Sequence, residues 1–184
     1  MKSLGAILFY VFFSLLAFIL SHIFKVSLLN VSPLWRSAST IWVVISGFAL
    51  GAIVIVINHF LDKFPLFSRL NAAIAQYLTD LGFTDIIVLS VASSIGEELL
   101  FRGALLQVIG IHASSFLFGF LHYGGKRPFL LWGVMGWVMG YLLSGLFLAT
   151  GSLLSPILAH FTINYFNLIH LTRDCTSQPP GEVP

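Results

Sequence analysis

Three short clusters of polar residues interrupt apolar stretches of this sequence, and their residue types could carry out hydrolysis. The clusters are Glu97-Glu98-Leu99-Leu100-Phe101-Arg102, Phe118-Gly119-Phe120-Leu121-His122 and His160-Phe161-Thr162-Ile163-Asn164. Ionisable side chains are costly to place in hydrocarbon, so those found within membrane-length segments usually serve a function. Together they offer a proton acceptor, two imidazoles and an amide donor, which are the groups needed to activate water and stabilise an oxyanion.

The first cluster contains one carboxylate with an obvious partner and one without. On a helix, Glu98 and Arg102 are four residues apart and share a face, where they can form an ion pair. Glu97 points about 100° away around the helix. We expect the pair to keep Glu98 ionised in a supporting role, and Glu97 to accept a proton as general base. A buried pair that only packs the helix would explain Glu98 and Arg102 but would leave Glu97 without a purpose.

The other two clusters place imidazoles and an amide at helical spacing. His122 follows Phe118 by four residues, so the phenyl ring can support the imidazole from the preceding turn. His160 and Asn164 have the same spacing, which aims both at one region. A single histidine on an apolar helix is usually structural, but two of them with an amide and an unpaired glutamate favour a site. We expect Glu97 and His122 to hold a water, and His160 and Asn164 to stabilise the oxyanion formed when it attacks a peptide carbonyl.

A zinc site is the alternative to metal-free chemistry. Glu97, His122 and His160 could serve as three protein ligands with an open fourth position. The sequence has no His-Glu-x-x-His motif, and the uncharged Asn164 suits an oxyanion site better than a metal site. We therefore predict that no cofactor is used. The single Cys175 excludes a zinc site built from several cysteines.

The composition is that of an integral membrane protein. Of 184 residues, 58% are hydrophobic and only 9% are charged, whereas a soluble domain carries about 25% charged residues. The mean hydropathy is +0.97. The net charge of +2 gives no case for a nucleic-acid partner. We expect the partners to be the lipid bilayer and a membrane-anchored protein or peptide substrate.

The hydrophobic pattern predicts an all-α fold, a polytopic transmembrane helical bundle of about six spans. Apolar runs of about 20 residues are long enough to cross the hydrocarbon core as helices. The segment Lys63–Leu81 has apolar residues at helical spacing with polar residues between them, which predicts an amphipathic helix at the membrane interface. The expected spans are Leu4–Phe24, Thr40–Leu61, Thr84–Ile109, Ala113–Tyr123, Phe129–Ala149 and Leu153–Leu171.

Positive charges in the loops predict the orientation. With six spans, one side holds most of the basic residues, which by the positive-inside rule makes it the cytoplasmic side and places both termini there. Only Lys25 and Arg36 fall on the other side. The basic residues expected inside are Lys2, Lys63, Arg69, Lys126, Arg127 and Arg173.

Two glycine pairs have the four-residue spacing that lets helices approach closely. The pairs are Gly47 with Gly51 and Gly136 with Gly140. We expect them to pack helices within one chain in preference to forming a dimer, and the oligomeric state stays open.

The three clusters, in this order and inside membrane segments, resemble the motifs of the CPBP (Abi) intramembrane proteases. This family includes the type II CAAX prenyl proteases and bacterial bacteriocin-processing or immunity proteins. The resemblance extends from about Ser90 to Leu168. It is carried by Glu97-Glu98-x-x-x-Arg102, Phe118-x-x-x-His122 and His160-x-x-x-Asn164, with Gly96, Gly103 and the run Ser155-Pro156-Ile157-Leu158-Ala159 beside them.

The resemblance implies a glutamate-dependent intramembrane endopeptidase in a single integral-membrane domain. That domain covers residues 1–172, with the protease core at about 84–171 and a disordered tail at 173–184. The chain has fewer helices before the first motif than the eukaryotic CAAX enzymes, which favours a leader peptide or membrane-anchored tail in a bacterial inner (plasma) membrane over a prenylated substrate. The family's base, its water-positioning histidine and its oxyanion pair correspond to Glu97, His122, His160 and Asn164.

Two other classes of function remain open at this point. A non-catalytic immunity or peptide-binding protein of the same fold would keep the cavity and tolerate loss of Glu97 or His122. A proton-coupled transporter would use the same groups as a relay, but the sequence shows no internal repeat of the kind such transporters contain. All the groups needed for hydrolysis are intact, which favours the enzyme.

Overall fold

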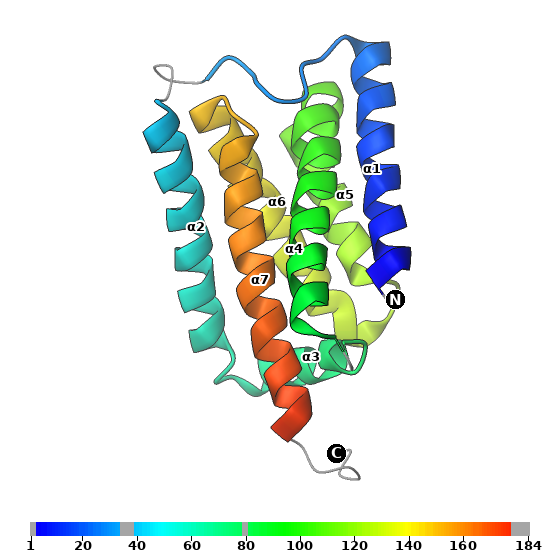
Figure 1. Cartoon of the computed structure of the whole chain (residues 1–184), viewed down its shortest axis with the longest axis vertical. Helices are drawn as coiled ribbons and strands as arrows, with labels where there is room; N and C mark the ends of the chain where they lie inside the picture. Colours follow the sequence, from blue (N-terminus) through cyan, green and yellow to red (C-terminus); the bar gives the residue numbers. More distant parts are fainter. Residues whose placement is uncertain (1–2, 34–38, 79–80, 178–184) are drawn as a thin grey trace.

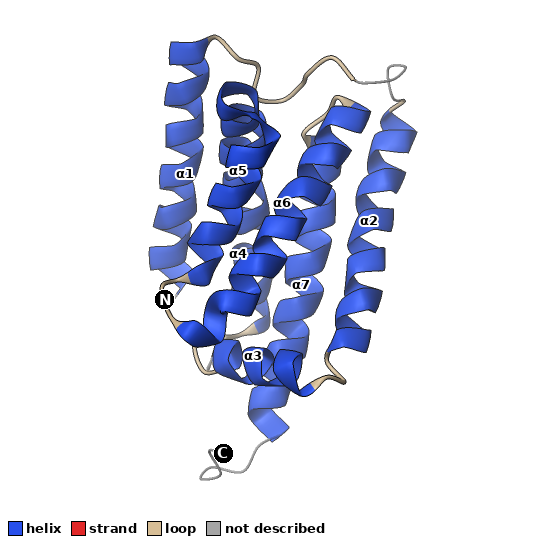
Figure 2. Ribbon diagram, turned by 180° about the vertical axis from the view of Figure 1, so that it is seen from behind, coloured by secondary structure: helices blue, strands red, loops and turns tan. Residues whose placement is uncertain are grey.

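The computed structural model describes residues 3–33, 39–78 and 81–177, and within these ranges the chain is a bundle of helices without a β-strand (Figure 1; Figure 2). This confirms the expected all-α membrane bundle. A π-helical segment, η1 (Leu99–Leu105), follows α4, and a short 3-10 turn, η2 (Arg127–Phe129), precedes α6. The α-helices are α1 (Ser3–Phe24), α2 (Thr40–Leu61), α3 (Pro65–Ala75), α4 (Phe83–Glu98), α5 (Leu106–Tyr123), α6 (Leu130–Thr150) and α7 (Leu154–Ser177).

The continuous helical stretch Phe83–Tyr123 doubles back on itself at Gly110. Gly110 has φ +79° and ψ 170°, a conformation that glycine adopts readily because it has no Cβ. The hydroxyl of Ser114 donates to the carbonyl oxygen of Phe101, 13 residues earlier, at 3.0 Å. In a straight helix that separation would be about 20 Å, so the chain must reverse. The first two polar clusters therefore meet across a helical hairpin, where the Arg102 guanidinium lies 4.3 Å from the centre of the Phe118 ring. Figure 1 shows the course of the two legs of this hairpin.

Four helical stretches among the described residues are long and apolar enough to cross a membrane. One of them, Phe83–Tyr123, contains the two legs of the hairpin, which correspond to the separate spans expected on either side of Gly110. α7 was also expected to span, but it is not among the four because several polar residues interrupt it. It packs between α2 and α4 inside the bundle. The other three stretches are Leu4–Phe24, Thr40–Leu61 and Arg127–Thr150.

α3 lies across one end of the bundle, at the end where α1 begins and α7 finishes (Figure 2). The amphipathic helix expected over Lys63–Leu81 is therefore present but shorter, because it begins at Pro65 and ends at Ala75. Proline suits the first helical position, where its missing N–H has no partner to lose. The two ends of the described chain thus share one side of the bundle, as the predicted orientation requires.

α7 continues to Ser177, five residues beyond the boundary expected at residue 172. The part of the expected disordered tail at 178–184 lies outside the described residues.

Both glycine pairs pack helices within the chain, as expected. A Cβ on Gly47 would lie 2.6 Å from the backbone oxygen of Ser155, so α2 rests directly on α7. A Cβ on Gly140 would lie 2.7 Å from Cα of Ser115, which brings α6 equally close to α5. These close approaches leave no room for larger residues and hold the motif-bearing helices together.

Candidate active site

A completely buried ion pair lies at the centre of the bundle. Nη1 of Arg102 donates to Oε1 of Glu98 at 2.8 Å, and neither side chain is exposed. The same guanidinium donates to the backbone oxygen of Met139 on α6 at 3.3 Å and lies 4.3 Å from the centre of the Phe118 ring on α5. Removing one partner of such a pair would leave a charge buried without compensation. Arg102 therefore fixes Glu98 and links three parts of the bundle.

Glu98 also holds His160, a contact between α4 and α7 that the spacing of the sequence did not reveal. Nδ1 of His160 lies 2.7 Å from Oε1 of Glu98. Because Arg102 neutralises that carboxylate in its ionised form, the oxygen can only accept, so Nδ1 carries the proton. The other nitrogen, Nε2, lies 3.8 Å from Oε2 of Glu97. Glu98 thus holds one nitrogen of His160, and the other nitrogen faces Glu97 at more than hydrogen-bond distance.

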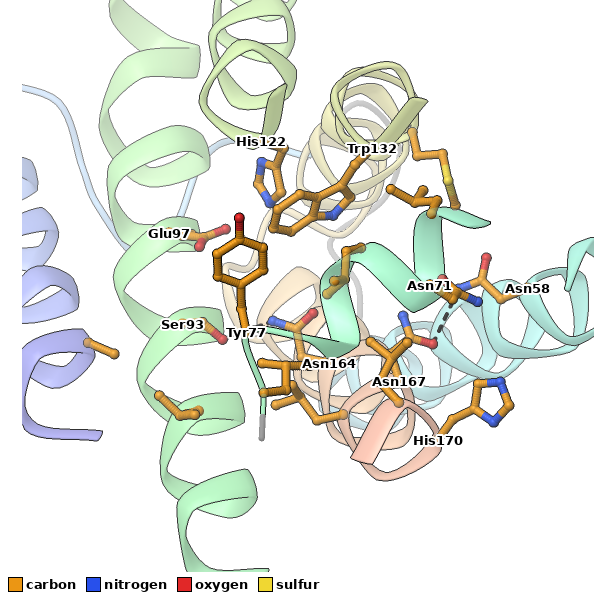
Figure 3. Close-up of a pocket in the computed structure, with 18 of the residues that line it drawn as sticks. Asn58, Asn71, Tyr77, Ser93, Glu97, His122, Trp132, Asn164, Asn167 and His170 are labelled. Atoms are coloured by element: carbon orange, nitrogen blue, oxygen red, sulfur yellow. Dashed lines mark hydrogen bonds between the residues drawn. The ribbon is translucent and has the colours of Figure 1, made fainter. Parts of the chain in front are cut away.

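A cavity of about 590 Å³ extends from this centre to α3. Glu97, His122 and Asn164 all line it, and Figure 3 shows their side chains directed toward the same space. Oε2 of Glu97 is buried and has no hydrogen-bond partner among the described residues. His160 is not among the lining residues and reaches the cavity only through Glu97. The structure therefore brings three of the four expected catalytic residues to the cavity wall and places the fourth behind one of them.

His122 is oriented by its own helix. Its Nδ1 lies 2.7 Å from the backbone oxygen of Phe118, and because a carbonyl oxygen can only accept, Nδ1 carries the proton. In the neutral imidazole Nε2 is then an acceptor. The ring packs against Phe118 at 4.5 Å and perpendicular to Trp132 at 5.1 Å between ring centres. These contacts fix the ring and leave Nε2 available to a water molecule.

Asn164 does not point at the same partner as His160, although the two were expected to converge. Its Nδ2 donates to Oγ of Ser93 at 2.9 Å. An amide nitrogen has two N–H groups, so one remains for a ligand. Ser93 precedes Glu97 by one helical turn, and this four-residue spacing was the signal that could have placed it in the site. Ser93 therefore orients the amide at the wall of the cavity beside Glu97.

The described residues contain no group of three or more His, Cys, Asp or Glu side chains arranged to hold a metal ion. The zinc alternative required Glu97, His122 and His160 to converge. Both histidines use Nδ1 for contacts within the protein, His160 with Glu98 and His122 with a backbone oxygen. Nε2 of each ring is therefore the nitrogen that a metal would use.

The segment that contributes Glu97, His122 and Asn164 to the cavity matches a known family. Residues 79–166 match the model of the type II CAAX prenyl endopeptidase Rce1-like family. The chain is also 31% identical over 139 residues to the uncharacterized protein YpbD of Bacillus subtilis (strain 168), a match that covers 73% of this chain and 71% of the relative. The chain belongs to the Rce1-like family. No solved structure matches it.

Membership of the Rce1-like family agrees with the resemblance that the three motifs carry. All of the motif residues, from Glu97 to Asn164, fall inside the matched segment. The family supports a protease-type enzyme, and the apolar helices together with the family support an integral membrane protein.

Proposed function

We propose that this protein is an intramembrane endopeptidase that hydrolyses a peptide bond of a membrane-associated protein or leader peptide. One observation carries the proposal: Oε2 of Glu97, a buried oxygen without a hydrogen-bond partner among the described residues, belongs to a side chain that shares a cavity with His122 and the amide of Asn164. A base, a second water-binding group and an oxyanion donor are thereby available to one bound carbonyl.

In the proposed reaction, Glu97 and Nε2 of His122 hold a water between them. Glu97 takes one proton as the water oxygen attacks the peptide carbonyl carbon. Asn164 donates its free N–H to the developing oxyanion. His160 adds its Nε2–H only if the substrate carbonyl reaches past Glu97, behind which the imidazole lies. The proton on Glu97 then passes to the amide nitrogen as the C–N bond breaks, which restores the carboxylate.

We propose the metal-free form of this mechanism. The contacts of Glu98 with Nδ1 of His160 and with Arg102 are compatible with either form, because a metal would use Nε2 of the ring. The uncharged amide of Asn164 beside Glu97 suits an oxyanion site better than a metal site.

The site is proposed to be reached from the cytoplasmic side of a bacterial plasma membrane. The cavity extends to α3, and the loops at that end carry Lys63, Lys126 and Arg127. Basic loops face the cytoplasm under the positive-inside rule. The relative from Bacillus subtilis is a bacterial protein, and we propose a bacterial leader peptide or membrane-anchored tail as the substrate.

The test is cleavage of a co-expressed library of tagged, membrane-anchored host precursors by the wild type and by Glu97→Gln, each with and without a zinc chelator. We expect cleavage by the wild type, none by Glu97→Gln, and no effect of the chelator. The matched control is Asp85→Asn, the same carboxyl-to-amide change at the start of α4, where the side chain caps the helix at Gly82; it should cleave like the wild type.

Other outcomes would contradict parts of the proposal. Full activity of a folded Glu97→Gln variant would exclude Glu97 as the base. Loss of cleavage in the chelator would replace the metal-free mechanism with a zinc mechanism. Absence of cleavage of any precursor by the wild type would favour a non-catalytic peptide-binding protein of the same fold.

A further inference from the structure

α1 packs against α4 at the residue that precedes the proposed base. A Cβ on Gly96 would lie 2.8 Å from the backbone oxygen of Tyr10 and 3.0 Å from its Cβ. The first distance is shorter than real Cβ contacts allow, so only glycine lets the two backbones lie this close. As a result, Tyr10 is placed beside Glu97, although α1 lies outside the segment that matches the family.

The phenol of Tyr10 reaches the same cavity as the proposed catalytic groups. Tyr10 is among the residues that line it, together with Glu97. The backbone contact between Tyr10 and Gly96 places the phenol next to Glu97 on the wall that the two side chains share. Two aromatic neighbours on α1 confine the phenol ring, with ring centres 5.4 Å away for Phe9 and 6.4 Å away for Phe13.

We propose that Tyr10 is a positioning residue for Glu97, and that its hydroxyl donates to the carboxylate and holds it in place for the water. This inference rests on the proposed function and extends the site from the motif-bearing helices to α1. A neutral donor suits this task, because it stabilises the ionised carboxylate without adding a cation that would make it a weak base. The other titratable groups around Glu97 include Glu98 and Arg102 from its own helical leg, His160 from α7, His122 from α5, and Tyr77, which follows α3 and lines the same cavity (Figure 3).

The first test is the pH–rate profile of Tyr10→Phe on the membrane-anchored precursor that the wild type cleaves. Loss of the donor disfavours the ionised carboxylate, so we expect kcat to fall about ten-fold with KM unchanged. The acidic limb of the profile should move to higher pH by about one unit. A role in packing alone would lower the amount of folded protein but would leave this limb in place.

The matched control is Tyr141→Phe, which removes a phenol hydroxyl that also has a partner. That hydroxyl lies 2.8 Å from Nδ1 of His112, and neither residue lines the cavity. We expect its pH–rate profile to coincide with that of the wild type. A profile of Tyr10→Phe that also coincides with the wild type would overturn the proposal.

A second measurement does not depend on cleavage and separates the failure of this inference from failure of the proposed function. The shift in Tm caused by Glu97→Gln is measured by thermal unfolding in detergent, once in the wild type and once in the Tyr10→Phe background. Coupled side chains give two different shifts. Equal shifts would overturn the contact, even if the wild type cleaves. Different shifts in a protein that cleaves nothing would sustain the contact while the proposed function fails.

Discussion

Two carboxylate–histidine pairs of this protein have the same chemistry and opposite surroundings. Glu98 and His160 lie 2.7 Å apart at the centre of the bundle, where the exposed fractions of the side chains are 0% and 7%. Asp62 and His170 lie 3.0 Å apart at the end where α3 crosses, with exposed fractions of 24% and 47%. The two pairs differ in burial and not in the kinds of residue paired. Burial decides how strongly each pair fixes the structure around it.

The two carboxylates also differ in their other partners, which are charged for Glu98 and uncharged for Asp62. Glu98 is neutralised by Arg102, a full charge buried with it. Asp62 accepts from the uncharged amide of Asn71 on α3 at 2.6 Å. Water can replace any partner at the exposed pair, whereas nothing can replace one at the buried pair. The buried pair thus fixes the geometry of the candidate site, and the exposed pair ties α3 to the ends of α2 and α7.

The largest effect expected from this difference is that of Glu98→Gln. The change leaves Arg102 buried without its counter-ion and takes the ionised acceptor from His160. We expect the free energy of unfolding to fall by about 3–5 kcal/mol, and activity to fall with it. Thermal or denaturant unfolding of the protein purified in detergent measures the first effect.

A Glu98→Gln variant as stable as the wild type but inactive would contradict this expectation. It would mean that Glu98 takes part in the chemistry and that its role and that of Glu97 had been exchanged.

The helical spans could be predicted well from the sequence because the bilayer sets their length. The expected spans Leu4–Phe24 and Thr40–Leu61 agree with α1 and α2 to within one residue. The reversal at Gly110 inside α5 agrees with the two separate spans expected from the sequence, which stop on either side of this residue. The π-helical segment Leu99–Leu105 was not, because no propensity of these residues distinguishes it from an α-helix.

The candidate site likewise has contacts that the sequence could predict and contacts that it could not. Contacts within one helix follow from four-residue spacing, and the structure contains the predicted ion pair between Glu98 and Arg102. Contacts between helices have no such signature. His160 meets Glu98 from 62 residues away, and Tyr10 lies on a helix that carries none of the motifs. The sequence could therefore name the motif residues but not the neighbours that orient them.

The second prediction compares two asparagines of α7 that both line the cavity but have different partners. Asn164 is held by Ser93 beside Glu97, whereas Asn167 lies at 3.4 Å from the amide of Asn58 on α2. Because an oxyanion donor acts only in the transition state, we expect Asn164→Ala to lower kcat by roughly 10²–10³. Asn167→Ala should change kcat by a few-fold at most. Steady-state kinetics on the cleaved precursor measures both.

Equal losses of kcat in Asn164→Ala and Asn167→Ala would contradict the assignment of the oxyanion role to Asn164 alone. They would indicate that the amides act together in binding substrate, and that Asn164 has no special place at the reacting carbonyl.

The smallest effect is expected from Asp62→Asn, which makes at the exposed pair the same carboxylate-to-amide change as Glu98→Gln makes at the buried one. Solvent and salt already screen Asp62 from His170, so the free energy of unfolding should fall by less than about 1 kcal/mol. Raising the ionic strength should reduce even this difference, since the Debye length shortens to about 3 Å at 1 M salt. A loss as large as that of Glu98→Gln, and insensitive to salt, would show that the end of the bundle at α3 is closed to water and that exposure does not separate the two pairs.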